Sequence, residues 1–196
     1  MSFRDYERFH PLTRQEWRSW LEANHKKSPG MWLVSYKKHT GKPALTYDEI
    51  VEEALCFGWI DSVANRVDDE RTMLLITPRK PRSGWSRPNK ERIERLTAQG
   101  RLAPAGIAAI EIAKANGSWE ALDASEAMVM PDDLAAALTK DEQAKGYFDK
   151  FPPSTKKAIY QQVLAAKRPE TREKRIAEVV RLAHDNRRFG QWRDRE

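Results

Sequence analysis

The first part of the chain contains two segments in which apolar residues recur at helical spacing. In residues 12–24 the apolar side chains fall on one face, and Thr13 stands where it can cap the helix. In residues 46–58 they do so again, with Thr46 at the start of a capping box and Gly58 as the stop. This pattern predicts two amphipathic helices.

Three other segments of this part are rich in residues that favour strands. Residues 31–38 contain β-branched and aromatic side chains between two glycines. Residues 59–67 and 71–77 are similar, and the acidic connection 68–70 between them has the length of a hairpin loop. We therefore expect a strand followed, after the second helix, by a β-hairpin.

Beyond Pro78 the spacing becomes helical and stays so. Proline opens five of the six segments, at the position where its missing N–H costs no hydrogen bond. The six segments are residues 88–99, 104–116, 131–138, 141–150, 153–167 and 169–186. Residues 117–130 have only a weak pattern, which is typical of a linker.

These elements predict an α+β fold. Its N-terminal part is a small antiparallel sheet with helices on one side, and its C-terminal part is mostly helical. We place an α+β domain at residues 1–116, a linker at 117–130 and a helical domain at 131–196.

Composition is that of a globular protein. The chain has 196 residues, 40% of them hydrophobic, with seven tryptophans, which is enough to form a buried core. No apolar run approaches the roughly 20 residues of a membrane span, and charged residues stand where a signal peptide would be apolar. The single cysteine excludes an internal disulfide. We therefore expect a cytoplasmic protein.

Charge is distributed unevenly along the chain. The formal net charge is +6, but residues 101–149 are predominantly acidic and residues 150–196 predominantly basic. This asymmetry suits an anionic partner, and it suits docking of the acidic and basic segments on each other equally well.

Several segments, taken in order, resemble the YdeI/OmpD-associated family, which is also called bacteriocin-protection. They are CFGWIDS from Cys56, TPRKPRSGWSRPNK from Thr77, GRLAPAG from Gly100, PDDLAAAL from Pro131 and FPPSTKKAIYQQVLAAKRPETREKRI from Phe151. The resemblance implies a link to tolerance of antimicrobial peptides and to an outer-membrane porin, with no reaction or cofactor. One departure is Gln162-Val163, where the resemblance leads us to expect a tryptophan-isoleucine pair.

The most unusual chemistry lies before the helix predicted from Pro88. A helix N-terminus carries a partial positive charge and unpaired N–H groups, so acids are expected there. The approach is cationic instead, and Glu91 is the first nearby acid. This combination predicts a site for a small anion. The candidate ligand-binding residues, including two on the hairpin, are Asp61, Arg66, Arg79, Ser83, Trp85, Ser86 and Asn89.

Structural roles for the same residues are the alternative. Asp61 can pair with one of the arginines, and Ser86 can cap the helix, which are commoner roles beside a helix start. Nucleic-acid binding is disfavoured, because the basic residues do not share one helical face and only Trp85 is placed to stack on a base. In the segment from Pro169, charges of opposite sign at helical spacing indicate a solvated face.

Catalytic patterns are scarce. The four histidines lack metal-ligand spacing, Cys56 is expected to be a buried thiol, and the neighbours Glu52 and Glu53 are expected to be solvated. No phosphate-binding glycine loop or nucleophile elbow occurs. We therefore predict no metal and no cofactor, and a binding protein rather than an enzyme. Asp61 is the one candidate base for an enzymatic alternative.

The preferred hypothesis is a YdeI/OmpD-associated-like protein that binds a small anionic molecule between the hairpin and the helix near Pro88. The alternative is an interaction protein that docks an acidic protein or nucleic acid through its basic loop and its tail from Arg168, including Arg187, Arg188, Arg193 and Arg195. No pattern in the chain indicates an oligomeric state.

Overall fold

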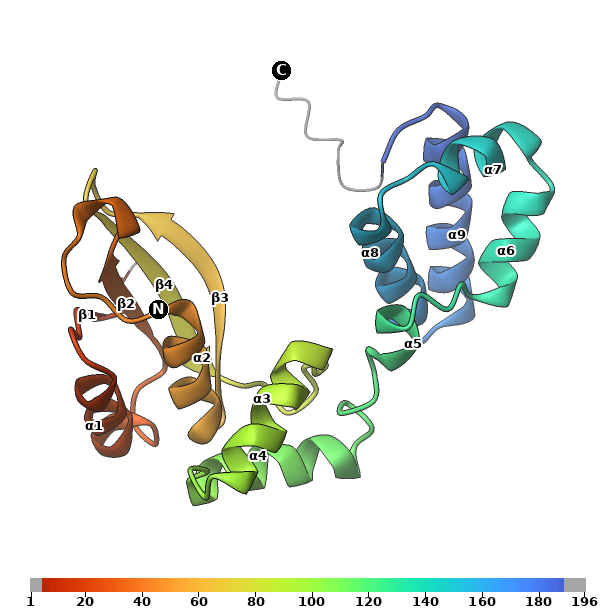
Figure 1. Cartoon of the computed structure of the whole chain (residues 1–196). Coiled ribbons are helices and arrows are strands. Elements are labelled where there is room, and N and C mark those ends of the chain that lie inside the picture. The colour runs from red at the N-terminus through yellow and green to blue at the C-terminus, as the bar shows by residue number, and fades with distance from the viewer. Residues whose placement is uncertain (1–4, 189–196) are drawn as a thin grey trace. The chain divides into compact units, whose positions relative to one another are not determined.

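The chain forms two compact units, which divide between Trp119 and Glu120 (Figure 1). The computed structural model describes residues 5–188. The predicted α+β class is confirmed by a small sheet and helices in the first unit and by helices in the second. Among the described residues, no helix is both long and apolar enough to cross a membrane.

The sheet of the first unit has the strand order β1-β2-β4-β3. The strands are β1 (Arg8–Phe9), β2 (Met31–Tyr36), β3 (Trp59–Arg66) and β4 (Arg71–Pro78). The predicted antiparallel pairing is found for β2 with β4 and for β4 with β3. The short strand β1 pairs parallel with β2 and was not predicted, because two residues carry no detectable alternation.

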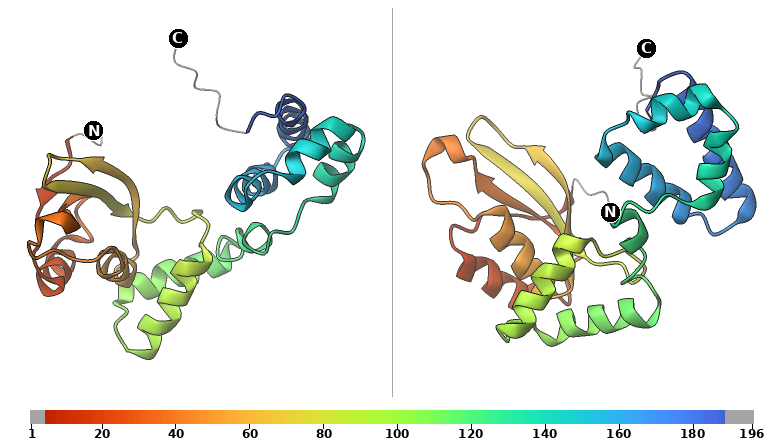
Figure 2. Two further views of the ribbon diagram at one scale, coloured as in Figure 1. Left: turned by 45° about the horizontal axis from the view of Figure 1, so that its top comes forward. Right: turned by 45° about the vertical axis from the view of Figure 1, so that its right-hand side comes forward.

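Two helices cover one face of this sheet (Figure 2). They are α1 (Arg14–Asn24) and α2 (Tyr47–Cys56), and a short 3-10 helix, η2 (Lys38–Thr40), lies before α2. Thr13 caps α1, and the predicted capping box of Thr46 and Glu49 is present in α2. Trp17 and Leu21 of α1 are fully buried against α2 and the sheet. Capping thus fixes where each helix starts, and the apolar face fixes its orientation.

Helices α3 (Arg87–Ala98) and α4 (Pro104–Ala115) complete the first unit. Gly58 ends α2 with a φ of 72°, a conformation that glycine adopts without strain. At Gly106 of α4 an added Cβ would lie 2.3 Å from the carbonyl oxygen of Cys56. Glycine at this position therefore lets α4 approach the end of α2 closely.

A β-bulge interrupts the pairing of β3 with β4. Asp61 lies opposite Ile76 and Ala64 lies opposite Leu74, so two residues of β3 face one residue of β4. Side chains alternate along a strand, and the extra residue brings Asp61 and Ala64 onto the same face. Because Ile76 belongs to the core under α1 and α2, this is the face that the helices cover.

Glu53 is the main correction to the residue-level expectations. Instead of being solvated, it has no exposed surface and pairs with Arg14, Arg18 and Arg101. Helix α2 carries it on the side turned towards α1 and the end of α3, where these arginines converge. A buried carboxylate needs such partners, because an unpaired charge in the interior is strongly unfavourable.

Within residues 120–188, the part that the structure describes, the second unit is a group of five helices with its own core. They are α5 (Asp123–Glu126), α6 (Asp132–Thr139), α7 (Glu142–Asp149), α8 (Pro153–Leu164) and α9 (Pro169–His184). Helices α6 to α9 occur where the apolar spacing predicts them. The short helix α5 lies in the segment predicted as a linker.

The motif KRPETREKRI joins α8 to α9 with two arginines. Arg172 donates to the carbonyl oxygen of Val163 at 3.2 Å, and Arg175 donates to that of Gln162. These carbonyls lie in the last turn of α8, where helical partners are lacking. Arg172 also forms two hydrogen bonds to Asp133 of α6, of 2.5 and 2.9 Å. These arginines therefore hold helices together rather than form only a solvated face.

Candidate functional site

A polar cavity of about 580 Å³ lies in the first unit between the start of β3, the loop after β4 and the first turns of α2 and α3. Five of the seven predicted site residues line it, namely Asp61, Arg79, Ser83, Ser86 and Asn89. The other lining residues are Tyr47, Ile60, Gly84, Pro88 and Arg92. We call this space the polar cavity.

Arg79 is held in place by backbone and ring contacts. Its own N–H donates to the carbonyl oxygen of Gly58 at 3.0 Å, which fixes the chain directly after β4. Its guanidinium lies 3.8 Å from the ring centroid of Trp85, and its Nη2 donates to the carbonyl oxygen of Gly84. Trp85 is 1% exposed and does not line the polar cavity. The role of this predicted site residue is to hold the Arg79 guanidinium over its ring.

The remaining donors of Arg79 lack partners. Its Nε and Nη1 are shielded from solvent and donate to no hydrogen-bond acceptor among the described residues. Burial lowers the pKa of Arg79 to about 10, although the charge of Asp61 acts in the opposite direction. The positive charge on Arg79 is therefore only partly compensated by the protein.

Asp61 is turned towards a tyrosine. Its Oδ2 accepts a hydrogen bond of 2.8 Å from the Tyr47 hydroxyl. Loss of hydration at the hydroxyl and this hydrogen bond raise the pKa of Tyr47 to about 12, while the ring remains half exposed. Within residues 5–188, no ion pair within 4 Å joins Asp61 to an arginine, so the structural alternative for Asp61 is not found.

The start of α3 contributes two uncharged polar side chains to the polar cavity, those of Ser86 and Asn89. Ser86 occupies the N-cap position, but its side chain makes no capping hydrogen bond, contrary to the structural alternative. The first turn contains no acid. Asn89 uses its Oδ1 to accept from Arg92 at 3.0 Å, and Arg92 also pairs with Asp48 of α2. Thus Arg92 ties α3 to α2 and fixes the orientation of the Asn89 amide.

Tyr47 and Arg92 were missed by the sequence reasoning. Arg92 follows Asn89 by three positions, which places both on one side of α3. Tyr47 is the first residue of α2 and precedes Asp61 by fourteen positions, so no local spacing links the two. Only the packing of α2 on the sheet brings them together.

Arg66 lies outside the polar cavity. It is near the far end of β3, where it pairs with Asp69, and 68% of its side-chain surface is exposed. Lys80, Arg82 and Arg87 are exposed as well. The tail residues Arg193 and Arg195 lie outside the described residues. Of the four cations Arg79, Lys80, Arg82 and Arg87, Arg79 is therefore the one that is not exposed.

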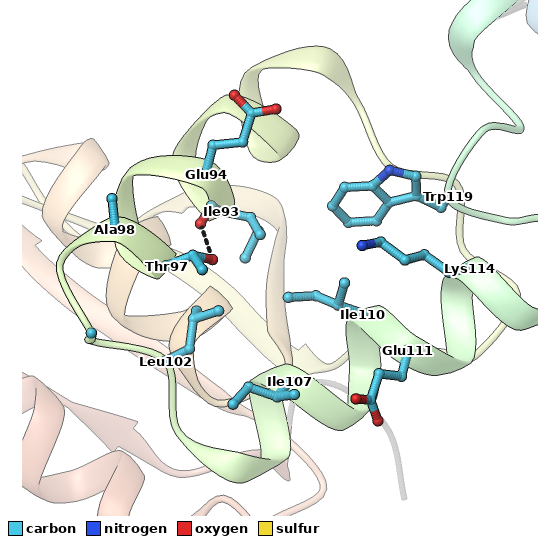
Figure 3. Close-up of a pocket in the computed structure, with 11 residues that line it drawn as sticks. Ile93, Glu94, Thr97, Ala98, Leu102, Ile107, Ile110, Glu111, Lys114 and Trp119 are labelled. Atoms are coloured by element: carbon cyan, nitrogen blue, oxygen red, sulfur yellow. Dashed lines mark hydrogen bonds between the residues drawn. The ribbon is translucent and has the colours of Figure 1, made fainter.

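A second and larger cavity, of about 820 Å³, has a different chemistry. It lies between α3 and α4, where Figure 3 shows Leu102, Ile107 and Ile110 directed into the space and Lys114 beside the Trp119 ring. The carboxylates of Glu94 and Glu111 point outwards (Figure 3). Its walls are mainly apolar; the Thr97 hydroxyl donates to the carbonyl oxygen of Ile93 at 2.7 Å, and Lys114 is the cation among the lining residues.

Cys56 is fully buried as expected, and burial raises the pKa of its thiol to about 11. Among residues 5–188, no three histidine, cysteine, aspartate or glutamate side chains are grouped to hold a metal ion.

Comparison with known families gives two matches. Residues 9–109, about half of the chain, match the domain of unknown function DUF8412, and residues 127–186 match the family described as bacteriocin-protection, YdeI or OmpD-associated. No curated protein and no solved structure is similar enough to match. The polar cavity lies in the first of the two matched regions. The chain therefore belongs to the DUF8412 family, and its second unit contains a region that matches the YdeI/OmpD-associated, or bacteriocin-protection, family.

Proposed function

We propose that the first unit binds a small anionic ligand in the polar cavity. The observation that carries this proposal is Arg79, whose Nε and Nη1 are buried without a partner among the described residues. A buried cation with unused donors is unfavourable unless an opposite charge compensates it. A carboxylate, sulfate or phosphate in the polar cavity supplies this charge, and it accepts from Nε or Nη1 once the Arg79 side chain turns these donors into the cavity.

The surroundings of Arg79 support an anion over a neutral ligand. Ser83 and Ser86 offer hydroxyl donors in the same cavity, and the first turn of α3 adds its partial positive charge. Asp61 opposes an anion, but its carboxylate accepts from Tyr47 on another wall. An anion next to Arg79 is also expected to reverse the lowering of the pKa of Arg79, since it stabilises the charged form.

Thermal unfolding with sodium sulfate tests this function. A ligand that binds only the folded state increases the free energy of unfolding by mass action, by about 2.7 kcal/mol when its concentration is a hundred times Kd. The midpoint of thermal unfolding rises as a result. We expect sulfate to raise the midpoint of the wild-type protein more than sodium chloride of the same ionic strength does. Because sulfate also stabilises folded proteins in general by exclusion from their surface, Arg79→Met is expected to show a smaller difference than the wild type.

Arg82→Met is the matched control, because Arg82 is an exposed cation of the same loop. It removes the same charge and is expected to keep the response to sulfate. Equal responses of Arg79→Met and the wild type would contradict the proposal, as would loss of the response in Arg82→Met alone.

The family match of the second unit suggests a physiological role for this binding. The second unit matches a family whose name refers to bacteriocin protection. We propose that ligand binding by the first unit contributes to protection against bacteriocins.

A further inference from the structure

A third cavity, of about 350 Å³, adjoins the polar cavity and is mainly apolar. Tyr47 lines both of them. Its other walls come from the sheet, from the start of α2 and from the segment before it; the apolar ones include Leu33, Leu45, Ile50, Ala64, Met73 and Leu74. We call this space the apolar hollow.

Small residues on the sheet create the hollow. The helix-covered face carries Met31 and Ile76 at one end, and both are fully buried. Towards the other end the same face carries Ala64, Ser35 and Thr72, which are small. Because strand side chains on one face are spaced at every second residue, these three leave room that larger residues would fill.

Ser35 contributes a hydroxyl group to the wall of the hollow. It is 8% exposed, and its Oγ has no hydrogen-bond partner among the described residues. A buried hydroxyl without a partner is unfavourable, as is uncovered apolar surface beside it. The walls of the hollow are therefore mainly apolar, and the sheet adds two hydroxyl groups, that of Ser35 and that of Thr72, which donates to the carbonyl oxygen of Asn65 at 2.9 Å.

We infer that the polar cavity and the apolar hollow bind one ligand, a carboxylate that carries an apolar chain. Its carboxylate lies against Arg79, and its chain passes Tyr47 into the hollow. The β-bulge supports this path, because it places Asp61 of the polar cavity and Ala64 of the hollow on the same face of β3. Each cavity has a volume in the range typical of ligand sites.

This inference rests on the proposed function and adds the class of ligand to it. A straight-chain carboxylate has the required chemistry, since its head is a single negative group and its body has no polar atoms. Lengthening the chain buries further methylene groups in the hollow. Each buried methylene is expected to tighten binding about fourfold.

Isothermal titration with acetate, butanoate, hexanoate and octanoate, each below its micelle concentration, tests this directly. We expect the dissociation constant to fall steadily from butanoate to octanoate. Equal dissociation constants for acetate and octanoate would overturn the inference. If sulfate still protects the protein in that case, the anion site itself stands.

Two variants that each introduce a phenylalanine on β3 distinguish an effect of filling the hollow from an effect of the added side chain elsewhere on the strand. Ala64→Phe fills the hollow and is expected to weaken octanoate binding at least tenfold, with acetate binding unchanged. Val63→Phe is the control, because Val63 is the exposed neighbour on β3 and lines neither cavity. It is expected to bind octanoate as the wild type does.

Further variants keep the test decisive. Thr72→Leu narrows the hollow from β4 and is expected to act like Ala64→Phe, even if the phenylalanine variant folds poorly. Arg79→Met is expected to lose both sulfate and octanoate binding. Wild-type octanoate affinity in Thr72→Leu and in a folded Ala64→Phe would overturn the inference, and tight octanoate binding by Arg79→Met would overturn the position of the carboxylate.

Discussion

Glu53 is a fully buried carboxylate surrounded by three arginines of the first unit. It accepts from Arg14 at 2.5 Å and from Arg18 at 2.8 Å, and Arg101 donates to the same group. These contacts join α1, α2 and the segment after α3. The carboxylate thus holds together three parts of the chain that are distant in sequence.

Glu53→Gln is expected to destabilise the first unit by about 3–5 kcal/mol, because the substitution leaves converging arginines without their buried counter-charge. The free energy of unfolding in urea measures the effect. Glu22→Gln is the matched control, since Glu22 pairs with Arg18 at the surface, with 53% of its side chain exposed. A comparable loss in both variants would show that burial of Glu53 is not the cause.

Single residues of the polar cavity were partly predictable. Arg79, Ser83, Ser86 and Asn89 stand out because a cationic loop leads into a helix start, which is a local pattern. The contact of Tyr47 with Asp61 depends on how α2 packs on the sheet. The buried state of Glu53 is also a tertiary property, since its neighbours in sequence suggest a solvated charge. Local chemistry thus indicates a site, whereas its walls depend on packing.

Secondary-structure elements followed the sequence wherever several signals agreed. Helix α2 has a capping box, acids in its first turn and a glycine stop, and it forms where these predict it. Strand β1 has two residues and α5 has four, which is too short for a periodic pattern. These two elements depend on pairing with β2 and on packing, respectively.

Helices α8 and α9 are joined by Arg172, which bonds both the end of α8 and Asp133 of α6. Arg172→Ala is expected to destabilise the second unit by about 1–3 kcal/mol, because a carbonyl and a carboxylate lose a charged donor. The midpoint of thermal unfolding measures this loss. Arg181→Ala, which removes an exposed pair with Glu178 on α9, is expected to change stability much less. Similar effects of the two substitutions would contradict this role for Arg172.

The whole chain combines two units, each with its own hydrophobic core. The core of the first unit gathers Trp17, Trp59 and Trp85, and that of the second gathers Phe148, Ile159 and Val163. The two family matches fall one in each unit. Each unit therefore has the elements of a domain that folds by itself.

Separate expression of residues 1–119 and 120–196 tests this independence. Each fragment is expected to unfold cooperatively, the second with a helical circular-dichroism spectrum, because its apolar core is contained within it. The first fragment is expected to keep the sulfate response of the full chain. A non-cooperative or unfolded fragment would show that its core is not sufficient for folding.

The bulge in β3 has a consequence for comparing this chain with others. Removing one residue between Asp61 and Ala64 would restore the two-residue alternation of a regular strand and leave both side chains on the same face of the sheet. A homologue that is one residue shorter there would therefore still turn its aspartate towards Tyr47. In an alignment of this family, a single gap at Ser62 or Val63 would mark the loss of the bulge, with the polar cavity kept.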